Sequence, residues 1–195
     1  HLCGIDTGHF LLFDYPDEME ALFDAMHTYN KKAARLVAQH SPSDVIYFSE
    51  NTSTTLISPA QFRKYCKKHL IDYANIAADE GATMLYHMCG HIGLLLKDLN
   101  EIPNRGYEAF TTPTVGSATL EMGRREMPDK AIIGGTNCDN WIRPAVETIS
   151  QIEQNIAPLP SLRGIALSSA GVLPPECSPE TLREVARWLN AHRLD

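Results

Sequence analysis

Five short apolar runs alternate with amphipathic segments along this chain, and this alternation restricts the fold more than any other feature of the sequence. The runs, each predicted to be a β-strand, cover residues 44–50, 83–89, 107–111, 131–136 and 164–169. Helices are predicted before, between and after them, over residues 17–40, 58–80, 91–99, 118–126, 144–156 and 179–192. Apolar strands separated by helices are typical of a buried parallel sheet. The sequence therefore predicts an α/β fold.

Two architectures could hold such a sheet. An open, doubly wound sheet that binds a dinucleotide would carry a GxGxxG turn, but residues 134–137 (GGTN) are too short for that fingerprint. The other architecture is a (β/α)8 barrel, which needs about 250 residues. Because this chain has 195 residues and five strand–helix units, we predict a single domain over residues 1–195 that forms the C-terminal part of a barrel.

Composition and charge exclude several classes of protein. No run approaches the roughly 20 apolar residues of a membrane span. The net charge of −7, from 24 acidic and 17 basic residues, argues against a nucleic-acid partner. Five cysteines, an odd number in a chain of this length, argue against a disulfide framework. Since no signal-peptide pattern follows His1, we expect a cytoplasmic protein and leave open whether native residues precede His1.

Polar residues gather where the predicted strands end, which is the catalytic edge of a parallel barrel. These residues are Glu50, His87, Cys89, Asn137, Cys138, Asp139 and, in the loop after the last strand, Cys177. His87 and Cys89 are two residues apart, so they point to the same face of a strand, and both are preferred zinc ligands. A third ligand would have to come from another loop. The alternative is a packed strand pair without a metal, because cysteine is commonly buried.

Four segments resemble the uroporphyrinogen decarboxylase superfamily, and most closely its zinc-dependent branch, the methylcobamide:thiol methyltransferases. They are residues 87–90 (HMCG), 56–62 (LISPAQF), 132–137 (IIGGTN) and 169–179 (SAGVLPPECSP). The resemblance implies a (β/α)8 barrel in which the five strands here are strands four to eight. By the same resemblance, the first three strands and the N-terminal Arg-rich segment of the decarboxylases would be missing here. The presence of HMCG, together with Gly171-Val172 where the decarboxylases carry Gly-His, favours the methyltransferase branch.

The resemblance also implies a ligand set. Zinc would be held by His87, Cys89 and a third residue. In the methyltransferases this third residue is a cysteine directly after the glycine of the closing loop, the loop after the last strand, which here is residues 169–179. Val172 occupies that place here and cannot bind metal, so Cys177 is the expected third ligand and Cys138 ranks second. Glu50 is the expected catalytic residue, as a fourth ligand, a hydrogen-bond acceptor behind the ligands, or a proton acceptor.

The implied activity is methyl transfer between a methyl-corrinoid and a thiol or related small molecule. The corrinoid would arrive on a small partner protein, because the chain carries no Asp-x-His-x-x-Gly motif, and Asn137 and Asp139 are the expected cofactor-binding residues. Two alternatives stay open: a metal-free decarboxylase-like enzyme acting on a tetrapyrrole, and a non-catalytic fragment or binding module. Five strands leave two sheet edges unpaired, so either further residues of the chain or a homodimer is expected to cover them.

Overall fold

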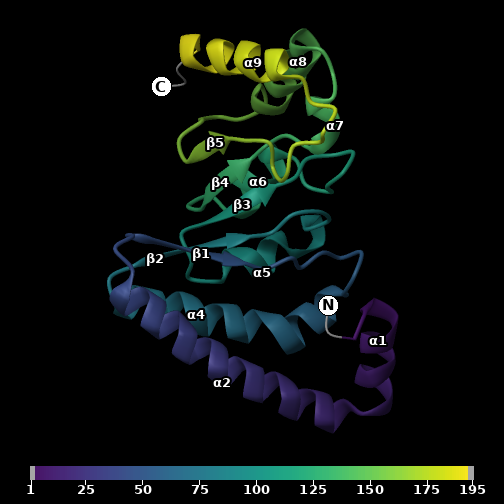
Figure 1. The fold of residues 1–195 in the computed structure, drawn as a ribbon, viewed down its shortest axis with the longest axis vertical. Helices are drawn as coiled ribbons and strands as arrows, with labels where there is room; N and C mark the ends of the chain where they lie inside the picture. The colour runs from purple at the N-terminus through teal and green to yellow at the C-terminus, as the bar shows by residue number, and fades with distance from the viewer. Residues whose placement is uncertain (1–2, 193–195) are drawn as a thin grey trace.

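Five parallel strands form one sheet in the computed structural model, which describes residues 3–192 (Figure 1). The strands are β1 (Val45–Ser49), β2 (Thr83–His87), β3 (Gly106–Phe110), β4 (Ala131–Gly134) and β5 (Ile165–Leu167). They lie side by side in chain order, each parallel to the next. This confirms the α/β prediction and agrees with an arc of a barrel, because the order of a doubly wound sheet would reverse. All five C-terminal ends therefore meet at one rim.

The helices connect and cover these strands. They are α1 (Ile5–Asp14), α2 (Pro16–His40), α3 (Pro59–Gln61), α4 (Lys67–Asp79), α5 (Leu96–Asn100), α6 (Leu120–Glu126), α7 (Cys138–Trp141), α8 (Ala145–Ile156) and α9 (Pro179–Ala191). A π-helical turn, Phe62–Cys66, joins α3 to α4. The Ser58 side chain accepts a hydrogen bond from the Gln61 N–H, and the Gln61 side-chain oxygen accepts one from the Ser58 N–H, as the capping pattern predicts. None of the helices within residues 3–192 is long and apolar enough to cross a membrane.

One predicted helix differs from the structure, and two short observed helices were not predicted. The segment predicted as one helix over 91–99 begins with a 3-10 turn at Gly93–Leu95 and becomes α-helical only in α5. The N–H of Gly93 donates to Ser117 Oγ at 3.0 Å, and a Cβ on Gly93 would lie 2.7 Å from the Ser117 carbonyl oxygen. This close approach delays the helix. The short helix α7 was not predicted, and neither was α1, which buries no residue.

The two faces of the sheet have different surroundings. Ile46, Met84 and Tyr86 are buried against the helices. On the other face, Val45 is 43% exposed and Tyr47 is 53% exposed. The prediction of a buried sheet therefore holds on one side only, because five strands form an arc rather than a closed barrel. The open side corresponds to the inner face of the barrel.

The hydrophobic core lies in two clusters. The larger one fills the space between the sheet and helices α4, α5 and α6, where Tyr86 and Tyr107 are fully buried. Both phenols find buried acceptors: Tyr86 donates to the Leu70 carbonyl oxygen, and Tyr107 donates to that of Leu99 at 2.6 Å. The smaller cluster joins α7, α8 and α9 around Trp141. These packed layers hold the strand ends, and thus the rim, in fixed positions.

Candidate functional site

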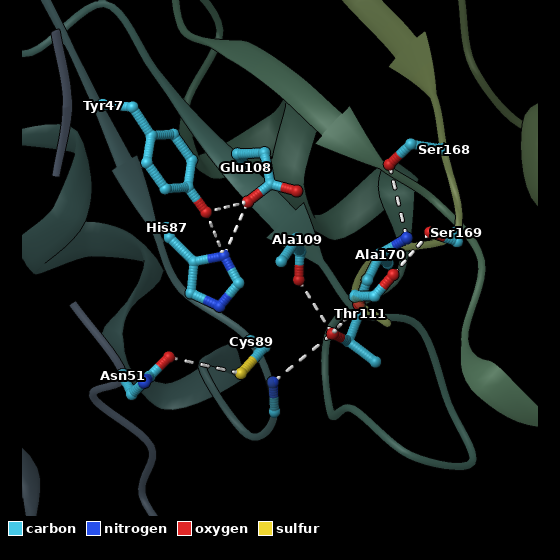
Figure 2. Close-up of polar contacts among 12 residues, drawn as sticks. Tyr47, Asn51, His87, Cys89, Glu108, Ala109, Thr111, Ser168, Ser169 and Ala170 are labelled. Atoms are coloured by element: carbon cyan, nitrogen blue, oxygen red, sulfur yellow. Dashed lines mark hydrogen bonds and ion pairs between the residues drawn. The ribbon is translucent and has the colours of Figure 1, made fainter. Parts of the chain in front are cut away.

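Three polar side chains from neighbouring strands meet on the inner face of the sheet (Figure 2). They are Tyr47 of β1, His87 of β2 and Glu108 of β3. The Tyr47 hydroxyl donates to Glu108 Oε2 at 2.8 Å. The Nδ1 atom of His87 lies 2.6 Å from the same carboxylate oxygen and 2.6 Å from the Tyr47 oxygen. His87 is the last residue of β2, whereas Tyr47 and Glu108 are the middle residues of β1 and β3. The cluster therefore lies close to the C-terminal ends of the strands, where parallel barrels carry their chemistry.

The bonding within the cluster determines the state of the histidine. Burial, together with the hydrogen bond and negative charge of Glu108, raises the pKa of Tyr47 to about 12, so the phenol keeps its proton at neutral pH. A carboxylate can only accept hydrogen bonds. The proton between His87 and Glu108 is therefore on Nδ1 of the imidazole. In the neutral ring this leaves Nε2 with a free lone pair, the form of histidine that binds metals.

Cys89 lies on the other side of the imidazole from Tyr47 and Glu108, just beyond the end of β2 (Figure 2). Its thiol lies 3.7 Å from the Oδ1 atom of Asn51, to which it donates. Nε2 of His87 points away from the carboxylate and toward this side (Figure 2). Imidazole and thiol are a donor pair that suits zinc. Within residues 3–192, however, no group of three or more His, Cys, Asp or Glu side chains is arranged to hold a metal ion. The donors fit zinc in kind, and the set is incomplete in number.

The two candidate third ligands lie apart from this pair. Cys177 packs against the cluster of Trp141 and Val185, and its thiol lies 3.8 Å from the Ser178 carbonyl oxygen. Ser178 caps α9, which keeps Cys177 beside that helix. Cys138 is the first residue of α7. Within the described residues, neither Cys177 nor Cys138 forms a common donor group with His87 and Cys89.

The start of the closing loop does reach the rim. The Thr111 hydroxyl accepts from the Gly90 N–H at 3.4 Å, and it also lies 2.8 Å from the Ala109 carbonyl oxygen and 3.5 Å from that of Ala170 (Figure 2). Ala109 and Ala170 have φ values of 59° and 53°, a conformation that is strained for alanine. Strained backbone of this kind is frequent at functional sites.

The family model for uroporphyrinogen decarboxylase (URO-D) matches residues 4–191 of the chain. The chain belongs to the uroporphyrinogen decarboxylase family. The match includes all five strands and the whole rim, so the resemblance read from the four segments is confirmed at the level of the family. Family membership indicates an enzyme, and both decarboxylase and methyltransferase chemistry agree with it. A comparison with curated proteins finds no match.

Glu50 is not part of the rim cluster of this family member. It follows Ser49 at the end of β1, where side chains alternate between the two faces of the sheet, and it points to the helix side. There it lines a cavity of about 190 Å³ between β1, α2 and α4, which Cys66 and His69 also line. Thr52 donates to its carboxyl group, and burial raises the pKa of Glu50. The side chain is thus separated from His87 by the sheet.

Asn137 and Asp139 lie at the same rim but on another part of it. The Asn137 amide donates to the carbonyl oxygens of Thr112, at 3.2 Å, and Pro113, at 2.8 Å. Asp139 accepts from the Thr114 hydroxyl at 2.9 Å. Both residues line a polar pocket of about 270 Å³ beside α8. The buried oxygen Oδ1 of Asn137 finds no hydrogen-bond partner within the described residues.

Tyr47, Glu108 and Thr111 are the site residues that sequence reasoning missed. Glu108 had a signal, since it is a charged residue within the apolar run 106–110 (GYEAF). A carboxylate at such a position needs a partner, because an unpaired buried charge is costly. Tyr47 had a weaker signal: in β1 its side chain points to the face of the strand opposite that of the apolar Phe48. Their meeting depends on the register of three strands, which the sequence alone does not provide.

Proposed function

We propose that this chain carries the catalytic rim of a zinc-dependent methyltransferase, which moves a methyl group between a methyl-corrinoid and a thiol or related small molecule. The observation that supports it is the state of His87, whose Nδ1 atom is engaged by Glu108 at 2.6 Å while Nε2 faces the side of Cys89. A carboxylate that orients a histidine in this way is typical of zinc sites. The HMCG segment carries both ligands.

The residues have separate roles in this proposal. Bound zinc lowers the pKa of a coordinated thiol, so that a thiolate is available near neutral pH. His87 and Cys89 hold the metal, and Glu108 keeps the imidazole in the required tautomer. Cys177 is the proposed third ligand and has to leave its packing beside α9 to reach the rim; Cys138 is the second choice. The corrinoid would supply the methyl group and keep the electron pair of its cobalt–carbon bond, and the substrate sulfur would form the new bond to the methyl carbon.

The corrinoid is proposed to arrive on a small protein that docks at the C-terminal rim. The inner face around Tyr47 is exposed, which leaves room for a large planar group. Asn137 and Asp139 are proposed to contact the cofactor or its substrate from the pocket beside α8, where Asn137 Oδ1 has an unused acceptor site. Asn137 would accept a hydrogen bond there and Asp139 would supply negative charge.

The experiment measures zinc content and thiol-dependent demethylation of methylcobalamin in the full-length protein and in single Cys→Ser variants. We expect Cys89→Ser to lose the metal and the activity, and Cys177→Ser to lose most of both. Cys3→Ser is the matched control, because Cys3 is exposed just before α1 and should change neither. Loss with Cys138→Ser instead of Cys177→Ser would move the third ligand to α7. Full zinc retention in Cys89→Ser would overturn the proposal.

One observation favours a second candidate function. The hydrogen-bonded chain from Tyr47 through Glu108 to His87 can relay a proton without any metal. A decarboxylase-like enzyme needs such a group to protonate the carbon that has lost carbon dioxide. Release of carbon dioxide from a carboxylated tetrapyrrole by chelator-treated protein, and its loss in His87→Gln, would support this function over methyl transfer.

A further inference from the structure

A basic pocket lies at the opposite rim of the sheet, where the strands begin. Arg105 and Lys130 come directly before β3 and β4, Arg163 comes shortly before β5, and Arg124 of α6 joins them. Together they line a pocket of about 730 Å³. The volume is within the range of small-molecule sites. The pocket is separate from the His87 site, because the two lie at opposite ends of parallel strands.

The charge of this pocket contrasts with that of the chain. The protein has a net charge of −7, yet this pocket is lined by four cationic side chains and by only one acidic residue, Asp129. Within residues 3–192 none of the four cations forms an ion pair with a carboxylate. Like charges brought together without counter-charges repel, so the arrangement needs either a structural reason or an anionic ligand.

A structural reason exists for two of the cations. Arg124 donates to the carbonyl oxygens of Pro128 at 2.7 Å, of Lys130 at 3.0 Å and of Arg163 at 3.0 Å. Lys130 donates to the Asn104 carbonyl oxygen at 2.7 Å. These bonds satisfy carbonyl groups that follow helix ends, a common use of basic side chains. They also hold both cations in place before any ligand arrives.

In the described part of the chain, the other two cations of the pocket, Arg105 and Arg163, do not hold backbone carbonyl groups in this way. Arg105 and Arg163 are exposed, and their guanidinium groups make no side-chain hydrogen bond to the described residues. The charge of Arg105 nevertheless acts on Lys130: burial lowers the pKa of its ammonium group, the positive charge of Arg105 lowers it further, and the charge of Asp129 opposes this in part. A bound anion would relieve that repulsion.

We infer that this N-terminal rim binds a small polyanion with clustered phosphate oxygens, held by the free guanidinium groups of Arg105 and Arg163 above the fixed charges of Arg124 and Lys130. Guanidinium groups match phosphate geometry through paired N–H donors. Two free groups at a concave site, backed by two preorganised cations, suit a ligand with several charges rather than a single anion. This site does not depend on the proposed function of the opposite rim.

The test is calorimetric titration of the full-length protein with tripolyphosphate, and with citrate as the carboxylate counterpart. The variant Arg105→Gln/Arg163→Gln removes the two free cations and should fold normally, because neither side chain bonds to the described residues. Arg183→Gln/Arg187→Gln on the exposed side of α9 removes the same charge elsewhere. We expect tripolyphosphate to bind the wild type, and the pocket variant to lose about tenfold or more in affinity. The control should bind as the wild type does.

Several outcomes would overturn the inference. One is the absence of tripolyphosphate binding at about millimolar concentration in the wild type, with circular dichroism showing a folded protein. Another is equal weakening in the two double variants, which would mean that net charge alone attracts the anion. Tighter binding of citrate would replace phosphate by carboxylate as the recognised group. Binding of a DNA oligonucleotide without binding of tripolyphosphate would replace the small ligand by a macromolecule.

Discussion

Replacing Glu108 by glutamine tests whether the carboxylate prepares His87 for a metal. The glutamine would keep the size of the side chain but lose its charge, and its amide would offer a single acceptor oxygen to two donors, Tyr47 and His87. The imidazole would then be free to turn or to move its proton to Nε2. Either change removes the lone pair that the proposed zinc site requires.

The expected magnitude follows from the contacts. Loss of a carboxylate behind a metal-binding histidine commonly costs about 10–100-fold in metal affinity, or about 1.4–2.7 kcal/mol. The side chains of His87 and Glu108 remain 18% and 25% exposed, so water partly screens the interaction. We therefore expect Glu108→Gln to weaken zinc binding by roughly tenfold, near the lower end of that range.

The assay is zinc binding by competition with a chromogenic chelator at pH near neutrality. Tyr47→Phe is the matched control: it removes the second donor to Glu108 but leaves the 2.6 Å contact with His87, so zinc affinity should change little. A second measurement reports on the contact itself. Because Glu108 helps to raise the pKa of Tyr47 to about 12, that pKa should fall toward its ordinary value in Glu108→Gln, as followed by tyrosinate absorbance.

These two measurements separate the contact between Tyr47 and Glu108 from its consequence for metal binding. Suppose that the pKa of Tyr47 falls as expected but zinc binds Glu108→Gln as tightly as the wild type. The carboxylate contact would then be real but without consequence for the metal, and the argument that Glu108 orients a zinc ligand would fail. An unchanged pKa of Tyr47 would instead contradict the hydrogen-bonded cluster itself.

Three further predictions concern the loop, the cavity and the sheet. Val172→Cys places a thiol where the resemblance to the methyltransferases puts the third ligand, so zinc affinity should rise about tenfold in the same chelator assay. Unchanged zinc affinity would contradict the proposal that a ligand at residue 172 can complete the site. Burial raises the pKa of Glu50 above 4.5, so its ionisation penalises the folded state as pH rises through that value. The free energy of unfolding of Glu50→Gln should therefore increase relative to that of the wild type as the pH rises above 4.5, as measured by urea unfolding. At Gly134 φ is 144°, and an added Cβ would lie 2.5 Å from the Phe110 carbonyl oxygen. Gly134→Ala should therefore lower the free energy of unfolding by about 2–3 kcal/mol, as measured by thermal unfolding.

The fold could be predicted because its signals are local. Each strand is a short apolar run between helices, and the capping residues Ser58 and Ser178 mark the starts of two of these helices. The predicted strand boundaries lie within about two residues of the observed ones. The helix α1 could not be predicted in this way. It buries no residue, so it has no apolar stripe against the core for a periodic pattern to show.

The candidate site could be predicted only where the chemistry lies within one segment. His87 and Cys89 share the end of one strand, and the HMCG segment is enough to indicate them. Glu50 was expected beside them because it also ends a strand. The alternation of side chains along β1 turns it to the opposite face, and that alternation was readable from Phe48, its apolar neighbour on the helix side. Cys177 depends on the path of a loop, which no local pattern determines.

The backbone around Thr111 is strained where the chain enters the closing loop. The left-handed conformations of Ala109 and Ala170 cost about 1–2 kcal/mol each. The hydroxyl of Thr111 has one proton to share between the carbonyl groups of both residues, and such a hydrogen bond returns only about 1 kcal/mol. The remainder must come from the burial of the two alanines, which are 0% and 6% exposed. Packing therefore maintains a strained arrangement that holds Ala170, at the start of the loop, against Thr111, whose hydroxyl also accepts from the Gly90 N–H.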